Sequence, residues 1–146
     1  MPIKVKKIVL WRGQVDNVPG ALARALDPLA GAKVNLQVVM GYHVHGEQAK
    51  AIVEVFPIAG KKAAAAAAGV GLAAASLPAL LVEGDDRPGL GHAMARAVAD
   101  AGINMNFLVA QVFKKRFSAV IGFESDADAT AATPLIKKAG AKKAKK

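Results

Sequence analysis

The sequence repeats itself once, and this repeat constrains the fold more than any other feature. Pro88-Gly89 lies 69 residues after Pro19-Gly20. Further small or polar residues match in the same register, without a gap: Asp16 with Asp85, Asn17 with Asp86, and Val34-Asn35 with Ile103-Asn104. An internal repeat that fills about half of a chain of 146 residues predicts two copies of one structural unit.

The hydrophobic pattern changes in the same order within each copy. An apolar run rich in branched residues, 7–15 or 77–84, ends at acidic and Pro-Gly residues and predicts a strand and a turn. Apolar residues three and four apart then predict an amphipathic helix. These helices are expected to begin at Pro19 and Pro88 and to end near Gly31 and Gly102, with Pro28 breaking or bending the last turn of the first.

Two further apolar stretches follow each helix and predict a pair of strands joined by a hairpin. The expected strands are 34–42 with 50–56, and 103–113 with 117–123. Second helices are expected at 60–69 and 126–140, and the later one opens on carboxylates that suit a helix N-terminus. The predicted fold class is therefore α+β: two tandem ferredoxin-like βαββαβ units, each an antiparallel sheet with its helices on one face.

The final strand of each unit is a separate question. The first unit can form it from 70–76, whereas lysine and alanine follow Gly140 in the second unit. The second sheet then has an open edge, to be covered by residues 3–9, by the tail, or by a second chain, and this edge favours a homodimer. The expected boundaries are 1–75 for the first unit, 76–140 for the second and 141–146 for a basic tail.

Composition restricts the chemistry and the location. With 53% apolar residues the chain can bury a core, and with no cysteine it has no disulfide or thiolate site. Neither a secretory signal nor a membrane span is recognised, because lysines interrupt the apolar N-terminus and the alanine-rich region 63–82 contains glycine, serine and proline. We expect a cytoplasmic protein without membrane contact.

The net charge of +9 arises mostly at the C-terminus. Six lysines account for six of these charges: Lys137, Lys138, Lys142, Lys143, Lys145 and Lys146. The remaining chain is close to balanced, and no aromatic residue in the tail could stack on bases. A solvated end is favoured over weak, salt-sensitive contact with nucleic acid. Sequence alone leaves open whether the basic turn 114–116 lies on the same side as the tail.

The element order, together with 16–37 and 85–106, resembles the ACT domain, a ferredoxin-like module that binds amino acids. The closest resemblance is to small proteins made of two tandem ACT domains, and it covers about 4 to 140. The most specific part is an acidic or amide residue two positions before Pro-Gly, followed by a hydrophobic-Asn pair some fifteen residues later.

The resemblance implies a ligand site at the loop after the first strand and at the asparagine that opens the second strand. The implied positions are Asn17 with Asn35 and Asp86 with Asn104, and the loop of the second unit also contains Arg87 and Gly89. Helix N–H groups at this loop favour a ligand carboxylate, and Asp86 can bind an ammonium group. The sites differ, since Val18 and Asn17 stand where the second copy has Arg87 and Asp86.

Other interpretations of the same residues remain open at this point. Asp85 or Asp86 could cap the following helix instead of binding a ligand. His43, His45 and Glu47 alternate along one expected strand face, but three polar residues at an exposed hairpin end are favoured over a metal site. No catalytic constellation is recognised, so no enzyme activity, metal or cofactor is expected.

The leading hypothesis is a non-enzymatic sensor of an amino acid or similar small metabolite. It would act through ligand-dependent assembly or an unidentified protein partner. The alternative is a structural, oligomerising protein whose lysine-rich tail contacts nucleic acid or another polyanion.

Overall fold

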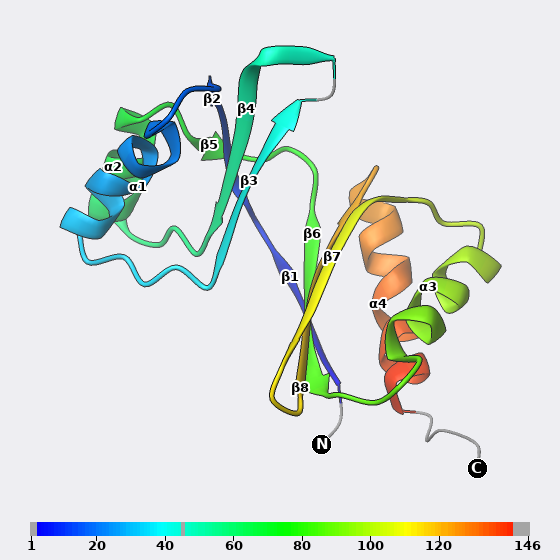
Figure 1. The fold of residues 1–146 in the computed structure, drawn as a ribbon. Helices are drawn as coiled ribbons and strands as arrows, with labels where there is room; N and C mark the ends of the chain where they lie inside the picture. The colour runs from blue at the N-terminus through cyan, green and yellow to red at the C-terminus, as the bar shows by residue number, and fades with distance from the viewer. Residues whose placement is uncertain (1–2, 45, 142–146) are drawn as a thin grey trace. The chain divides into compact units, whose positions relative to one another are not determined.

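A computed structural model describes residues 3–44 and 46–141 and divides the chain into two compact units. The inserted unit comprises Val9–Ser76, and the split unit comprises Met1–Ile8 with Leu77–Lys146. Within the described residues each unit has a four-stranded antiparallel sheet and two helices, and Figure 1 shows both helices on one face of each sheet. The predicted fold class is confirmed.

The inserted unit has the predicted order of elements. These are β2 (Trp11–Asp16), α1 (Ala21–Gly31), β3 (Val38–Val44), β4 (Glu47–Phe56), α2 (Lys61–Gly69) and β5 (Ala73–Ala74). The strand order across the sheet is β3-β4-β2-β5. The short β5 pairs with β2 and lies within the stretch 70–76 that was expected to supply the last strand.

The core of the inserted unit lies between the sheet and its two helices. Val53 and Val55 alternate along β4 toward the helices and pack in one cluster with Leu29 of α1 and Ala67 of α2. Leu72 closes this cluster, and a Cβ at Gly13 of β2 would lie 2.5 Å from the carbonyl oxygen of Gly71, so only glycine fits there.

The proline expected to interrupt the first helix does not end it. α1 contains Pro28 and continues to Gly31, and the backbone N–H of Ala32 still donates to the Pro28 carbonyl at 3.0 Å. Pro28 lies in the last turn, where its missing N–H removes a single helical hydrogen bond.

The split unit has the same order of elements, except that its fourth strand comes from the N-terminal segment of the chain. Its elements are β6 (Ala79–Asp85), α3 (Leu90–Asp100), β7 (Met105–Phe113), β8 (Arg116–Phe123), α4 (Asp126–Ala141) and β1 (Lys4–Ile8). The strand order is β1-β6-β8-β7, so β1 takes the place that β5 has in the inserted unit. Leu80, Val82 and Ile121 pack against Met94 of α3 and Ile136 of α4.

The N-terminal strand completes the second sheet. β1 pairs antiparallel with β6 from Lys4 opposite Glu83 to Ile8 opposite Ala79. The apolar run expected to form one strand at 7–15 is therefore divided between two sheets, with Val9 and Leu10 between them. Of the three candidates for the open edge, residues 3–9 cover it, so this edge no longer argues for a homodimer. The first unit accordingly begins at Val9 and not at residue 1.

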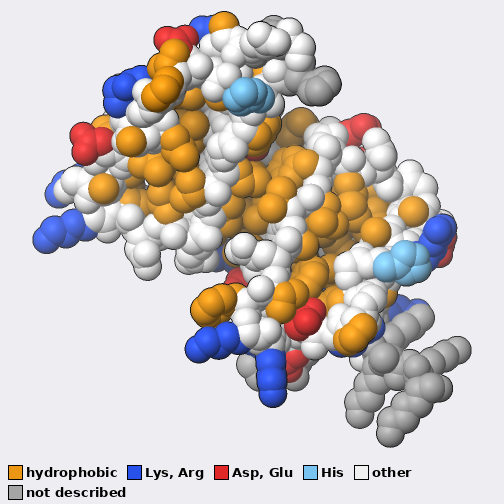
Figure 2. Space-filling view, in the orientation of Figure 1, with side chains coloured by type: hydrophobic (Ala, Val, Ile, Leu, Met, Phe, Trp, Pro, Cys, Tyr) orange, Lys and Arg blue, Asp and Glu red, His pale blue; other side chains and the backbone are white. Residues whose placement is uncertain are grey.

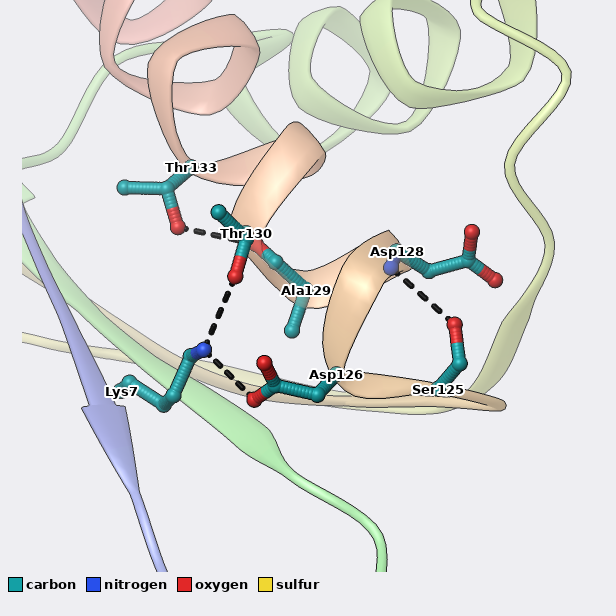
Figure 3. A network of polar contacts seen from close by, with 7 residues as sticks. All are labelled: Lys7, Ser125, Asp126, Asp128, Ala129, Thr130 and Thr133. Atoms are coloured by element: carbon teal, nitrogen blue, oxygen red, sulfur yellow. Dashed lines mark hydrogen bonds and ion pairs between the residues drawn. The ribbon is translucent and has the colours of Figure 1, made fainter.

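Polar contacts join β1 to the start of α4 (Figure 3). Lys7 Nζ donates to Asp126 Oδ1 at 2.6 Å and to Thr130 Oγ1 at 2.9 Å. Ser125 Oγ accepts the backbone N–H of Asp128 at 3.1 Å, which caps the first turn of the helix. Lys7 thus binds the negatively charged first turn of α4, where carboxylates also suit the helix dipole, as the sequence predicted.

Packing also holds the N-terminal strand in place. The side chain of Ile3 is buried, and a Cβ at Gly140 of α4 would lie 2.5 Å from Ile3 Cγ1. Gly84 of β6 leaves similar room for the same side chain. None of the described helices is long and apolar enough to cross a membrane.

Candidate functional site

The loop between β2 and α1 is tied to the start of β4 in the inserted unit. The backbone N–H of Asn17 donates to the Ala49 carbonyl at 2.9 Å, and its side-chain amide donates to the Gln48 carbonyl at 2.8 Å. Beside it, Lys50 Nζ donates to Asp16 Oδ1 at 3.0 Å. These contacts give the loop a defined shape before any ligand binds.

The N-terminus of α1 opens directly onto this loop. Gly20 stands at the cap position with φ of 87°, and no side chain caps the helix. The first turn therefore offers backbone N–H donors and the positive end of the helix dipole. Arg24 adds a full positive charge at this end of the helix. Its guanidinium lies beside Gly20, with Nη1 3.1 Å from the position that a Cβ on Gly20 would take.

Two cavities flank the same loop. The larger, of about 330 Å³, is lined by Gln14, Val15, Asp16, Ala21, Arg24, Ala25 and Val70. The smaller, of about 210 Å³, has Asn17, Val18, Leu22, Tyr42 and Ile52 in its lining. Pockets for drug-sized ligands usually begin at about 300 Å³, so these volumes suit a molecule of amino-acid size.

The larger cavity carries opposite charges. Asp16 can accept from an ammonium group and Arg24 can donate to a carboxylate, the two charged ends of a free amino acid. The hydrogen bond from Lys50, and then the Lys50 charge, hold the pKa of the Asp16 carboxyl below its ordinary value. Asp16 therefore stays ionised at neutral pH.

The split unit builds the same loop 69 residues later. Arg116 Nη1 donates to Asp85 Oδ1 at 2.8 Å, as Lys50 does to Asp16. The backbone N–H of Asp86 donates to the Lys115 carbonyl at 2.9 Å, as Asn17 does to Ala49. The exposed Asp86 carboxylate cannot reproduce the hydrogen bond that the side-chain amide of Asn17 donates, because a carboxylate has no N–H.

Neither aspartate of this loop caps the helix that follows. The cap position of α3 is Gly89, with φ of 81° and no side-chain hydrogen bond. Asp85 is held by Arg116 instead. The helix-cap interpretation is therefore wrong for both, and Gly89 is needed for a left-handed backbone that other residues rarely adopt.

The remaining predicted ligand-binding residues either donate to other protein groups or lie away from the two cavities. Arg87 Nη2 donates to the carbonyl of Ala139 at 2.9 Å, at the end of α4. Asn104 directly precedes β7, and its amide donates to Glu124 Oε1 at 3.2 Å. Asn35 is exposed three residues before β3 and lines neither of the two cavities. The two asparagines thus precede the strands that they were expected to open.

Sequence reasoning missed Arg24, although a signal for it exists. Arg24 follows Gly20 by four residues, so it lies one turn into α1, where a long side chain can turn back to the helix N-terminus. Comparison of the copies did not reveal it, because the matching position is Ala93.

No group of three or more metal-binding side chains occurs among residues 3–44 and 46–141. His43 is exposed on β3, whereas His45 and the side chain of Glu47 lie outside the described part of the chain. The suggested His43, His45 and Glu47 group is therefore not tested.

Comparison with known proteins relates this chain to others by structure. No family model matches the sequence, and no curated protein matches it by sequence. Among solved structures, protein BT0572 from Bacteroides thetaiotaomicron matches with a TM-score of 0.71 and 14% identity, over 88% of this chain and 87% of that one. The regulatory subunit of aspartate kinase from Thermus thermophilus matches with a TM-score of 0.63 and 18% identity, over 95% and 97%.

The tandem ACT fold is confirmed. A third match, the aspartate kinase of Clostridium acetobutylicum, is described as an allosteric enzyme and has a TM-score of 0.57 at 13% identity. It covers 94% of this chain but only 34% of that enzyme. At such identities the likeness establishes only the fold of this chain.

Proposed function

We propose that this protein is a non-enzymatic regulator that binds a free amino acid, or a metabolite of similar size and charge, at the β2–α1 loop. The observation that carries the proposal is the larger cavity, which brings the Asp16 carboxylate and the Arg24 guanidinium together beside the uncapped N-terminus of α1. The ligand carboxylate would meet Arg24 and the helix N–H groups, and its ammonium group would meet Asp16.

The fold supports a regulatory role for this chain. The match to the regulatory subunit of aspartate kinase from Thermus thermophilus covers 95% of this chain and 97% of that one, so the two chains share their fold over nearly their full lengths. We propose no reaction and no cofactor for this chain. Its output would pass through a second copy of the chain or through another protein. The ligand would change this assembly by binding one assembly state more tightly than the other.

The split unit would hold a second, different site at the matching loop. Asp86 would bind an ammonium group, and the backbone at Gly89 would face the ligand carboxylate. Arg87 and Asn104 would position this loop, since both already donate to other groups. Asn17 would contact a ligand in the smaller cavity, and Asn35 would do so only if its segment moves.

A thermal-shift screen across the free amino acids tests the proposal. The only tryptophan, Trp11, lies in the inserted unit, so its fluorescence reports that unit alone. A ligand that binds only the folded state must raise the melting temperature, by an amount that grows with concentration. We expect at least one amino acid to do so.

Two matched arginine variants then locate the site. Arg24→Gln is expected to abolish the shift, whereas Arg96→Gln, an exposed change on α3 in the other unit, should leave it intact. An unchanged shift in Arg24→Gln would rule out this site, and no shift with any amino acid would rule out an amino acid as its ligand. Sedimentation with and without the ligand then shows whether assembly changes.

A further inference from the structure

One end of the split unit gathers basic side chains from separate segments. Lys114 and Lys115 form the turn between β7 and β8, and Lys137 and Lys138 lie near the end of α4. All four are exposed. We call these four lysines and Phe113 the basic end. Figure 1 shows the β7–β8 turn and the end of α4 at the same end of this unit, and Figure 2 shows Lys and Arg side chains there.

Hydrogen bonds establish that the two segments lie together. The loop after β6 contacts the turn, since Asp86 N–H donates to the Lys115 carbonyl at 2.9 Å. The next residue contacts the helix end, since Arg87 Nη2 donates to the Ala139 carbonyl at 2.9 Å. Two consecutive residues thus bridge the β7–β8 turn and α4. The sequence left open whether the turn 114–116 lies on the same side as the tail. The structure places the turn at the same end of the split unit as Lys137 and Lys138, and residues 142–146 lie outside the described part of the chain.

The turn also presents an aromatic ring. Phe113 is 73% exposed at the end of β7, the largest exposed fraction among the exposed large apolar side chains. Lys114 Nζ lies 5.6 Å from the centre of this ring. An accessible ring beside an ammonium group offers a stacking surface for a base and a charge for its phosphate.

The turn backbone supports a role other than folding. Lys114 has φ of 59°, a left-handed conformation for which hairpin turns favour glycine or asparagine. A lysine side chain at such a position is strained relative to glycine, because its Cβ crowds the following carbonyl oxygen. Strain of this kind is found more often at functional sites than elsewhere.

The acidic residues of this end do not cancel its charge. Asp85 is neutralised by Arg116, and Asp86 remains as an exposed carboxylate. The four exposed lysines outnumber this carboxylate, and the resulting net positive charge suits a polyanion.

We propose that the basic end binds single-stranded nucleic acid. Its lysines would contact successive phosphates, and one unstacked base would lie on the ring of Phe113. A duplex keeps its bases stacked inside, so it could use the lysines but not the ring. This activity goes beyond the proposed binding of an amino acid and uses different side chains.

Fluorescence anisotropy with labelled oligouridylate and oligothymidylate tests the proposal on the full chain. Affinity should fall as salt rises, and replacing two phosphate-binding lysines should reduce the slope of that dependence by about 1.4 for a single strand. The pair Lys137→Gln with Lys138→Gln is expected to show this loss. The matched control, Lys61→Gln with Lys62→Gln on α2 of the inserted unit, removes equal charge and should leave binding close to that of the parent.

Single variants separate loss of binding from loss of folding. Lys114→Gly should weaken binding while the melting temperature stays equal or rises, since glycine accepts the positive φ. Phe113→Ala should weaken binding at least about fivefold with an unchanged salt slope, because it removes stacking and no charge. Asp86→Asn should strengthen binding by removing a repulsive carboxylate.

Four results would overturn the proposal. The first is that the full chain fails to bind either oligonucleotide at low salt, and the second is that the Lys61 and Lys62 control weakens binding as much as the basic-end variants do. The third is that only removal of residues 142–146 affects binding, which would assign the binding to the tail. The fourth is that vesicles containing phosphatidylserine bind through the same lysines while the oligonucleotides do not, which would indicate a membrane surface instead.

Discussion

At the scale of single residues, a buried carboxylate depends on two neighbours. Glu54 is 4% exposed on β4, and it points away from the helices because Val53 and Val55 point toward them. The Tyr42 hydroxyl donates to Glu54 Oε2 at 2.7 Å, and Arg12 Nε lies 3.7 Å from Oε1. A buried carboxylate without such partners would destabilise the fold strongly.

Removing the tyrosine hydroxyl should therefore destabilise the protein. Tyr42→Phe keeps the ring but leaves Glu54 with fewer hydrogen bonds, and we expect the free energy of unfolding to fall by about 1–2 kcal/mol. Urea denaturation followed by Trp11 fluorescence measures this change in the inserted unit. A variant as stable as the parent would show that Glu54 does not need the hydroxyl.

The phenol of Tyr42 should ionise at a higher pH than a free tyrosine does. Burial, and then the hydrogen bond to Glu54, raise the pKa of Tyr42 above its ordinary value of 10.0. Tyr42 is the only tyrosine, so the phenolate absorbance of the folded chain reports it alone. The stability that this group contributes should be complete below about pH 10 and be lost as pH rises from there through the folded pKa. Tyr42→Phe should lack this alkaline loss, and a phenol that ionises at its ordinary pKa would contradict the expectation.

At the scale of elements, the two first helices end in the same way with different residues. Lys33 follows α1 with φ of 60°, and Gly102 follows α3 with φ of 74° at the matching position. A left-handed residue after a helix lets its last carbonyls bond backwards, and Val34 N–H indeed donates to the Leu29 carbonyl as Ile103 N–H does to Val98. At the end of its first helix the inserted unit therefore carries backbone strain that the split unit avoids at the matching position.

Exchanging these residues should move stability in opposite directions. Lys33→Gly should raise the free energy of unfolding of the inserted unit by about 0.5–1 kcal/mol, because relief of strain exceeds the added freedom of the unfolded chain. Gly102→Lys should lower that of the split unit by a similar amount. Urea midpoints with unchanged slopes give both values, and a lower midpoint for Lys33→Gly would contradict the strain argument.

At the scale of the whole molecule, the N-terminal strand makes the split unit discontinuous. The inserted unit lies between β1 and β6 in the sequence, so the sheet of the split unit cannot close until the chain has passed through β2 to β5. Ile3, directly before β1, and Ile8 of β1 are both buried, and Lys7 of β1 donates to Asp126 in the first turn of α4. The split unit therefore depends on both ends of the described chain.

Deleting residues 1–8 should unfold or destabilise the split unit and leave the inserted unit folded. The split unit would lose buried side chains and expose the edge of β6, and we expect it to lose cooperative unfolding and to associate. The inserted unit keeps all its strands, so the thermal transition of Trp11 fluorescence should persist. Circular dichroism measures the loss of the other unit, and two intact transitions would show that β1 is dispensable.

Much of this molecule follows from local sequence patterns. Pro-Gly turns, helical spacing and alternating strands depend on neighbouring residues. The repeated loops, and the order of elements that follows each loop from the first helix to the second, were therefore predicted correctly. Gly89 also lies at the start of a helix, as the Pro-Gly pattern indicated.

Tertiary structure alone decided three other features, because each depends on contacts between residues distant in sequence. The sequence by itself determined that two similar units exist, but strand pairing assigned Lys4–Ile8 to the second of them. The contact with Ala139 turned Arg87 from a free loop charge into a link to α4. The folding of α1 beside β2 brought Arg24 and Asp16 to one cavity, and the helical spacing of Arg24 from Gly20 does not by itself specify that contact between helix and strand.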